Sequence, residues 1–244
     1  MYFGTDVPDA AWSAGLRRTD VVLQPYHPLA RYGGFADRFP HARRYLYVNP
    51  TSVDPWVLEN GGGAAPVTGW DQRWGLPRLD VASEEGMSWA VRTALEVLLL
   101  DQGSATGLFV DDLDRLLPEE PQAALAFLQR VQDGADREIR WFVNRAFSLW
   151  DRIRALDAVL LEDIAPAITR HAPVDEVRWM RAEVLPAVDA ARERGVAVHA
   201  VAYADQEGMH SAAPDLALER DLAERLDSVT TGVARDAASW EVYA

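Results

Sequence analysis

The sequence contains neither cysteine nor lysine among its 244 residues. The lack of cysteine excludes disulfide bonds and thiolate metal sites, and it leaves the redox state of the compartment undetermined. Because all 24 basic residues are arginines, we interpret the basic composition as coding bias and not as a binding site. No run reaches the ~20 apolar residues that span a bilayer, so no membrane partner is expected.

The N-terminal segment, residues 1–6, lacks the basic and apolar regions of a signal peptide. The chain as it stands is therefore expected to be cytoplasmic, and secreted if a leader has been removed, which leaves its localisation open. The five histidines are scattered and form no metal-ligand spacing, so we expect no metal and no cofactor.

Acidic residues outnumber basic ones by 38 to 24, for a net charge of −14. This balance argues against nucleic acid as a partner, because phosphate binding requires clustered positive charge. It suits a cationic substrate, although an acidic surface that maintains solubility explains the charge equally well. The hydrophobic fraction of 49% is sufficient for one large core. We expect a monomer with a single domain over residues 1–244.

Eight short apolar runs alternate with helical segments along the chain. The predicted strands are residues 20–26, 44–50, 77–81, 107–113, 139–144, 158–162, 196–203 and 228–233. This alternation predicts a parallel sheet with right-handed crossovers, and eight repeats predict closure into a (β/α)8 TIM barrel. The rival doubly wound sheet needs a glycine-rich phosphate loop near the start, which Arg31–Gly34 does not provide.

Three local signals predict helix boundaries. Ser83, followed by Glu84 and Glu85, is typical of a helix start. Gly195 stands where a helix from about residue 174 should end. Pro186 lies inside that helix and should kink it or divide it in two.

Polar side chains follow several of the predicted strands, and in a barrel these ends meet at one face. The most prominent are the carboxylates of Asp111 and Glu162, each directly after an apolar run. Carboxylate pairs beside aromatic platforms are typical of sugar hydrolysis, in which one carboxyl protonates the leaving oxygen and the other attacks or activates water. Trp56, Trp70 and Trp74 stand in predicted loops, where a substrate platform and ordinary packing are equally good explanations.

An ordered set of short motifs resembles the endo-α-1,4-polygalactosaminidase family, glycoside hydrolase family 114. The motifs are residues 44–49 with 54–56, then 79–81, 107–114, 142–144, 159–162 and 202–205. The resemblance implies a (β/α)8 barrel that cleaves an α-linked amino-sugar polysaccharide. It implies that Asp111 and Glu162 are the catalytic carboxylates. The family usually has asparagine where this chain has Asp112.

We predict a retaining route with Asp111 as nucleophile and Glu162 as acid/base. The residues predicted to bind substrate are Tyr26, Asn49, Trp56, Asp80, Asp112, Asn144 and Tyr203. Two alternatives stay open. The acidic residues of both strand ends could bind Mg²⁺ or Ca²⁺ for a metal-dependent hydrolase or lyase, or the barrel could bind carbohydrate without turnover. The run from Asp111 to Asp114 could also be only an acidic turn that caps a helix.

Overall fold

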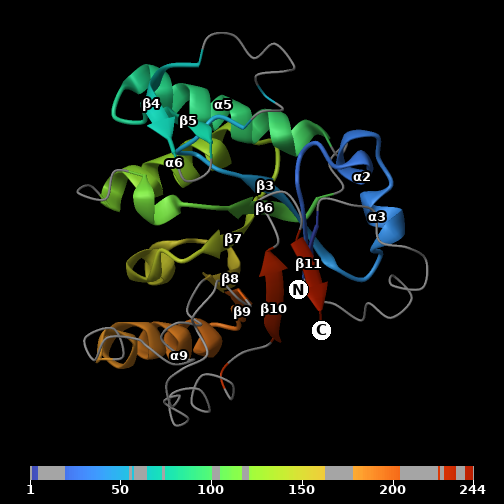
Figure 1. Ribbon diagram of the computed structural model, residues 1–244, viewed down its shortest axis with the longest axis vertical. Coiled ribbons are helices and arrows are strands. Elements are labelled where there is room, and N and C mark those ends of the chain that lie inside the picture. The colour runs from blue at the N-terminus through green and yellow to red at the C-terminus, as the bar shows by residue number, and fades with distance from the viewer. Residues whose placement is uncertain are drawn as a thin grey trace.

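The computed structural model describes residues 2–4, 20–54, 57, 65–72, 75–100, 105–116, 121–162, 178–203, 225, 228–234 and 240–243. Within them, one large sheet runs through the centre of the molecule (Figure 1). Its order is β1 (Tyr2–Gly4), β2 (Asp20–Leu23), β3 (Arg43–Val48), β6 (Gly107–Val110), β7 (Arg140–Asn144), β8 (Leu156–Glu162), β9 (Ala197–Tyr203), β10 (Ser228–Ala234) and β11 (Trp240–Tyr243). Neighbours from β1 to β10 are parallel, and β11 is antiparallel to β10.

The central strands are covered on both faces, as their unbroken apolar runs predict. Every residue of β2 and of β6 is buried. Successive residues alternate between two clusters, so that Leu108 and Val110 pack outward while Phe109 packs inward. The inner cluster is Val22, Tyr45, Phe109, Phe142, Ala158 and Leu160. This alternation carries the next odd position, residue 111, to the inner side at the carboxyl end of β6.

Helices lie around the outside of the strands (Figure 1). They are α2 (Pro28–Arg31), α3 (Phe35–Arg38), α5 (Glu84–Leu100), α6 (Pro121–Gly134) and α9 (Leu185–Glu193), with 3-10 turns η1 (Leu113–Arg115) and η2 (Phe147–Arg152). The predicted start of α5 is confirmed, because the Gly86 N–H donates to Ser83 Oγ at 3.0 Å. Gly195 follows α9 with φ +77°, the left-handed conformation expected after a helix.

Pro186 does not divide its helix in two, but the helix is irregular next to it, in line with the predicted disturbance. A π-helical turn, η3 (Met180–Val184), directly precedes α9, and Pro186 stands in the first turn of α9. Proline has no N–H to donate to the preceding turn, and the wider π turn is a common way to accommodate such a gap.

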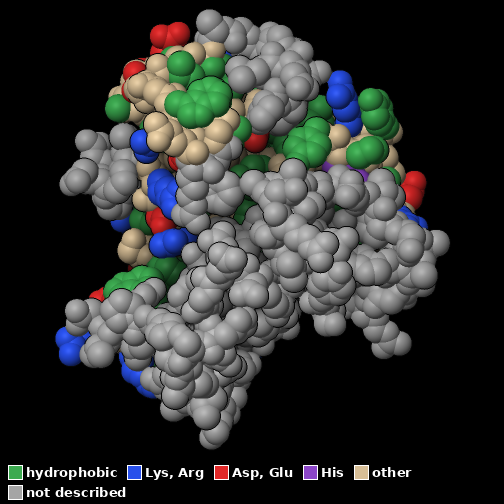
Figure 2. All heavy atoms as spheres, viewed as in Figure 1, with side chains coloured by type: hydrophobic (Ala, Val, Ile, Leu, Met, Phe, Trp, Pro, Cys, Tyr) green, Lys and Arg blue, Asp and Glu red, His purple; other side chains and the backbone are tan. Residues whose placement is uncertain are grey.

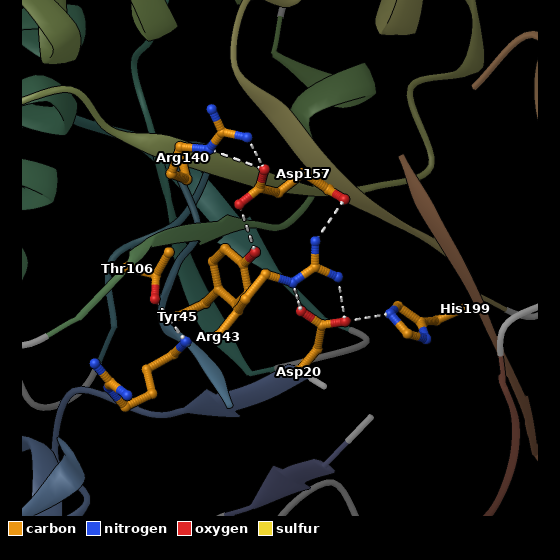
Figure 3. Close-up of polar contacts among 8 residues, drawn as sticks. Asp20, Arg43, Tyr45, Thr106, Arg140, Asp157 and His199 are labelled. Atoms are coloured by element: carbon orange, nitrogen blue, oxygen red, sulfur yellow. Dashed lines mark hydrogen bonds and ion pairs between the residues drawn. The ribbon is translucent and has the colours of Figure 1, made fainter. Parts of the chain in front are cut away.

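Hydrogen bonds across the interior show that the sheet is curled (Figure 3). His199 Nε2 on β9 lies 2.8 Å from Asp20 Oδ2 on β2, although four strands separate β2 from β9 in the sheet. The Tyr45 hydroxyl on β3 donates to Asp157 Oδ2 on β8 at 3.1 Å. The edge strands β1 and β11 come into contact with each other. The described chain is therefore a curled parallel sheet with helices outside it, as expected for the barrel class.

The predicted third barrel strand, residues 77–81, is wrong. The corresponding strand, β5 (Leu76–Leu79), pairs antiparallel with β4 (Val67–Asp71) in a separate two-stranded sheet. Pro77 lacks the N–H that a central strand needs, which favours such an outlying position. The main sheet instead contains a parallel strand that was not predicted, β1, which pairs with β2. Its three residues are too few to show a pattern in the sequence.

Among the described residues, no helix is long and apolar enough to cross a membrane.

Candidate active site

Asp111 lies at the carboxyl end of β6 and accepts hydrogen bonds on both carboxylate oxygens. Asn144 Nδ2 and the Asp112 N–H each donate to Asp111 Oδ1 at 2.8 Å. The Tyr47 hydroxyl donates to Asp111 Oδ2 at 2.8 Å. The donors come from β3, from β7 and from the turn after β6, so three segments fix the carboxylate. Donors directed at a carboxylate stabilise its ionised form.

Tyr47 is positioned by the inner face of β3. Its ring stacks on Phe109, with centroids 5.8 Å apart and an interplanar angle of 22°. Burial raises the pKa of the Tyr47 hydroxyl well above its usual value, and the carboxylates of Asp111 and Asp54 raise it further. The hydroxyl therefore keeps its proton and acts as a hydrogen-bond donor to Asp111.

Asp112 adopts a left-handed backbone conformation, with φ +48°. Asn49 Nδ2 donates to Asp112 Oδ2 at 3.0 Å, and Arg115 Nη1 lies 3.3 Å from Asp112 Oδ1. Burial raises the pKa of Asp112, as does the charge of Asp111, while Arg115 and Asn49 oppose the shift. Asparagine and aspartate are the residues other than glycine that best tolerate this conformation. The departure from the family's asparagine thus keeps the backbone geometry and adds a negative charge.

Asp54 is a further carboxyl close to this group. Burial raises its pKa to about 7, and the charge of Asp111 contributes to the shift. Asp54 lines a small cavity between the carboxyl end of β3 and α5, together with Asn49, Ser52 and Trp89. The described part of the site therefore holds three carboxyl groups, of which two have raised pKa values.

The structure brings together four of the residues predicted from the sequence: Asn49, Asp111, Asp112 and Asn144. The Glu162 backbone ends β8 and pairs with Val201, but its side chain lies outside the described residues. The Tyr203 backbone pairs with Gly232 at the end of β9, and its side chain also lies outside, as does the whole of Trp56.

Two predicted substrate-binding residues have other surroundings. Tyr26 is 44% exposed in the turn after β2. Asp80 follows β5 in the two-stranded sheet, so it does not end a strand of the main sheet as predicted. Of the loop tryptophans, Trp70 is 60% exposed on β4, and Figure 2 shows hydrophobic side chains at the surface over the β4–β5 hairpin.

The sequence prediction missed Tyr47 and Asp54 as members of the site. Tyr47 lies inside an apolar run and looks like a core residue, and only the strand alternation that it shares with Asn49 marks its inward face. Asp54 follows β3 by six residues and belongs to the motif 54–56, but the prediction gave it no role in the site. Among the described residues, no group of three or more His, Cys, Asp or Glu side chains has the geometry to hold a metal ion.

No family model matches the sequence, and no curated protein matches it. Solved structures do. The chain is similar to the glycoside hydrolase domain of PelA from Pseudomonas aeruginosa, with 21% identity and a TM-score of 0.62 over 99% of this chain and 96% of that one. It is also similar to Ega3 from Aspergillus fumigatus, solved in complex with galactosamine, with 10% identity and a TM-score of 0.65 over 99% and 93%. The predicted resemblance is thereby confirmed at the level of the fold, which this chain shares with glycoside hydrolase domains along nearly its whole length.

Proposed function

We propose that the chain is a glycoside hydrolase that cleaves an α-linked amino-sugar polysaccharide, with Asp111 and Glu162 as its catalytic carboxyl groups at the carboxyl end of a complete (β/α)8 barrel. The observation that carries the proposal is the fixed Asp111 carboxylate, which accepts hydrogen bonds from Tyr47, Asn144 and the Asp112 N–H. A carboxylate that accepts three hydrogen bonds and is held in one orientation suits attack on an anomeric carbon.

The strand register supports the pairing of Asp111 with Glu162. Asn144, which donates to Asp111, pairs with Leu160 of β8, two residues before Glu162. The two catalytic candidates therefore follow strands that flank β7, on either side of Asn144. Asp111 would attack the anomeric carbon, and Glu162 would protonate the leaving oxygen and then activate water, with net retention.

The charge of the site supports an amino sugar as substrate. Asp54, Asp111 and Asp112 interact electrostatically, and the guanidinium of Arg115 is about half exposed. A protonated amine on the sugar would offset this negative charge. The galactosamine in the Ega3 complex is consistent with such a substrate.

The test is hydrolysis of soluble α-1,4-linked galactosamine oligomers, with reducing ends measured over time. D111N and E162Q should each lower kcat/KM on the order of 10³-fold or more, as expected when a catalytic nucleophile or acid is removed. E96Q is the control, since it replaces an exposed carboxylate on α5 that pairs with Arg92, and it should retain activity. Wild-type rates in both D111N and E162Q would reject the proposed function. Proton NMR of the first product distinguishes retention from inversion.

A further inference from the structure

The cavity beside Tyr47 and Asp54 is lined by residues with buried polar atoms that the proposed reaction does not use. It lies between the carboxyl end of β3 and the middle turns of α5, and its polar lining includes Tyr47, Ser52, Asp54 and Trp89. Ser52 Oγ and Trp89 Nε1 are buried, and neither has a hydrogen-bond partner within the described part of the chain. Ser52 is 8% exposed and Trp89 is 5% exposed, so bulk solvent does not serve as the partner.

Buried polar atoms of this kind are generally satisfied by ordered water, provided that the site is polar and offers at least two partners. Ser52, Asp54 and Trp89 line the same cavity, and Ser52 Oγ and Trp89 Nε1 are buried without a hydrogen-bond partner in the described part of the chain. The geometry therefore favours a bound water that connects these three groups.

No basic side chain lines this cavity in the described residues. From α5 it receives Trp89, Thr93 and apolar side chains, and from the sheet it receives Tyr47. The charged group that acts on Asp54 is Asp111, which, after burial itself, raises the pKa of Asp54 to about 7. Asp54 consequently keeps its proton up to about pH 7 and is neutral below that pH.

We propose that Asp54 is a positioning residue for Asp111, acting through the Tyr47 hydroxyl and through water bound to Ser52 and Trp89. While Asp54 is protonated, the Tyr47 hydroxyl has one anionic partner and donates to Asp111 at 2.8 Å. Once Asp54 ionises, a second carboxylate competes for the same hydroxyl through the water, and Asp111 loses part of its support. The inference rests on the catalytic role proposed for Asp111.

The experiment compares the pH profiles of kcat/KM for wild type, D54N, Y47F and the double variant D54N/Y47F on galactosamine oligomers. Wild-type activity should fall as the pH rises through about 7, whereas D54N should keep its activity. The ratio of D54N to wild-type kcat/KM should rise several-fold from pH 6 to pH 8, because a group with a pKa near 7 falls from about nine-tenths to about one-tenth protonated over that range while the ionised form keeps part of its activity. In the Y47F background, D54N should cause no further change in the profile.

A D54N profile of the same shape as wild type would overturn the inference. A purely structural role would change the folded fraction of the protein, but not the pH at which kcat/KM falls. An undiminished effect of D54N in the Y47F background would also overturn the inference.

If D54N does not fold, W89F replaces it. The loss of the indole N–H removes a donor that supports ionised Asp54, so the fall in kcat/KM should move to higher pH. A fall at the wild-type pH would reject the proposal. Inactive D111N together with an unmoved D54N profile refutes only this inference, whereas fully active D111N and E162Q refute the proposed function.

Thermal unfolding gives a readout independent of turnover. The pKa of Asp54 in the folded state, about 7, lies above its ordinary value of 3.8. The stability linked to its protonation is therefore complete below about pH 4 and is lost as the pH rises through about 7. The Tm of D54N relative to wild type should increase between pH 5 and pH 8.5, and a constant Tm difference would contradict the raised pKa of Asp54.

Discussion

The carboxylates at the two ends of the sheet interior have different partners. At the amino ends of the strands lies the amino-end cluster, in which each carboxylate is bonded to a guanidinium (Figure 3). Its members are Asp20, Arg43, Arg140, Asp157 and His199. At the carboxyl ends lies the carboxyl-end cluster, Asp54, Asp111 and Asp112, in which carboxyl groups interact with each other and the pKa values of Asp54 and Asp112 are raised.

Charged and polar partners lower the pKa of Asp20 although it is buried. Burial alone would raise its pKa, but the hydrogen bonds from His199 and Arg43 outweigh burial and lower it. Arg43 binds both of its oxygens, with Nε and Nη2 each at 2.7 Å. The amino-end cluster ties β2, β3 and β9 together, which is a stabilising role, whereas in the carboxyl-end cluster burial and the charge of Asp111 raise the pKa of both Asp54 and Asp112. In barrel enzymes the amino-end face is generally the stabilising one and the carboxyl-end face the catalytic one.

The largest effect on stability is expected from D20N. The substitution leaves Arg43 and His199 without a buried anion, which costs about 3 kcal/mol of unfolding free energy, near the low end for buried pairs because the Arg43 side chain is 33% exposed. Urea denaturation measures the loss. E96Q is a matched control, because the exposed Arg92–Glu96 pair should contribute less than about 1 kcal/mol. Equal effects for the two variants would erase the contrast between the clusters.

Y47F should weaken catalysis with little effect on folding. The variant keeps the ring that stacks on Phe109 and removes the hydroxyl that donates to Asp111. Loss of one hydrogen bond to a charged group corresponds to roughly 1.5–3 kcal/mol, so kcat/KM should fall about tenfold or more. Steady-state kinetics measure the change, and an unaltered kcat/KM would show that Tyr47 only packs.

The smallest effect is expected from D112N. Asparagine tolerates φ +48° and still offers an oxygen to Asn49 Nδ2, so kcat/KM should change by less than about threefold. D112A removes that acceptor and disfavours the left-handed conformation, so it should lower the unfolding free energy by about 1–2 kcal/mol. If D112N were as damaging as D111N, Asp112 itself would belong to the catalytic machinery.

The strand ends could be predicted from the sequence, because buried parallel strands are unbroken apolar runs that stop at polar residues. This is why Asn49, Asp111 and Asn144 were expected at one face and do meet there. The pairings within the interior could not be predicted. Asp157, for example, is the extra residue of β8 where its register with β7 shifts between Trp141 and Phe142. A bulge of this kind changes which side chains face inward, and it depends on the partner strand as much as on the local sequence.

The β4–β5 hairpin was mistaken for a barrel strand for a related reason. A run of four residues such as Leu76–Leu79 reads the same whether its partner is parallel or antiparallel. β5 also has contacts more distant in sequence, such as the Val53 N–H that donates to Pro77 O at 2.9 Å. Tyr47 escaped prediction in the same way, since its hydroxyl gains a role only from the register of β3 with β6.

The most direct test of the division between the two ends measures kcat/KM and unfolding free energy for both D111N and D20N. We predict that D111N loses activity on the order of 10³-fold while its unfolding free energy stays within about 1 kcal/mol of wild type. We predict that D20N loses about 3 kcal/mol of stability, while its folded fraction keeps kcat/KM within about threefold of wild type. Catalysis that survives D111N, or that disappears in folded D20N, would contradict the assignment of catalysis to the carboxyl ends and stability to the amino ends.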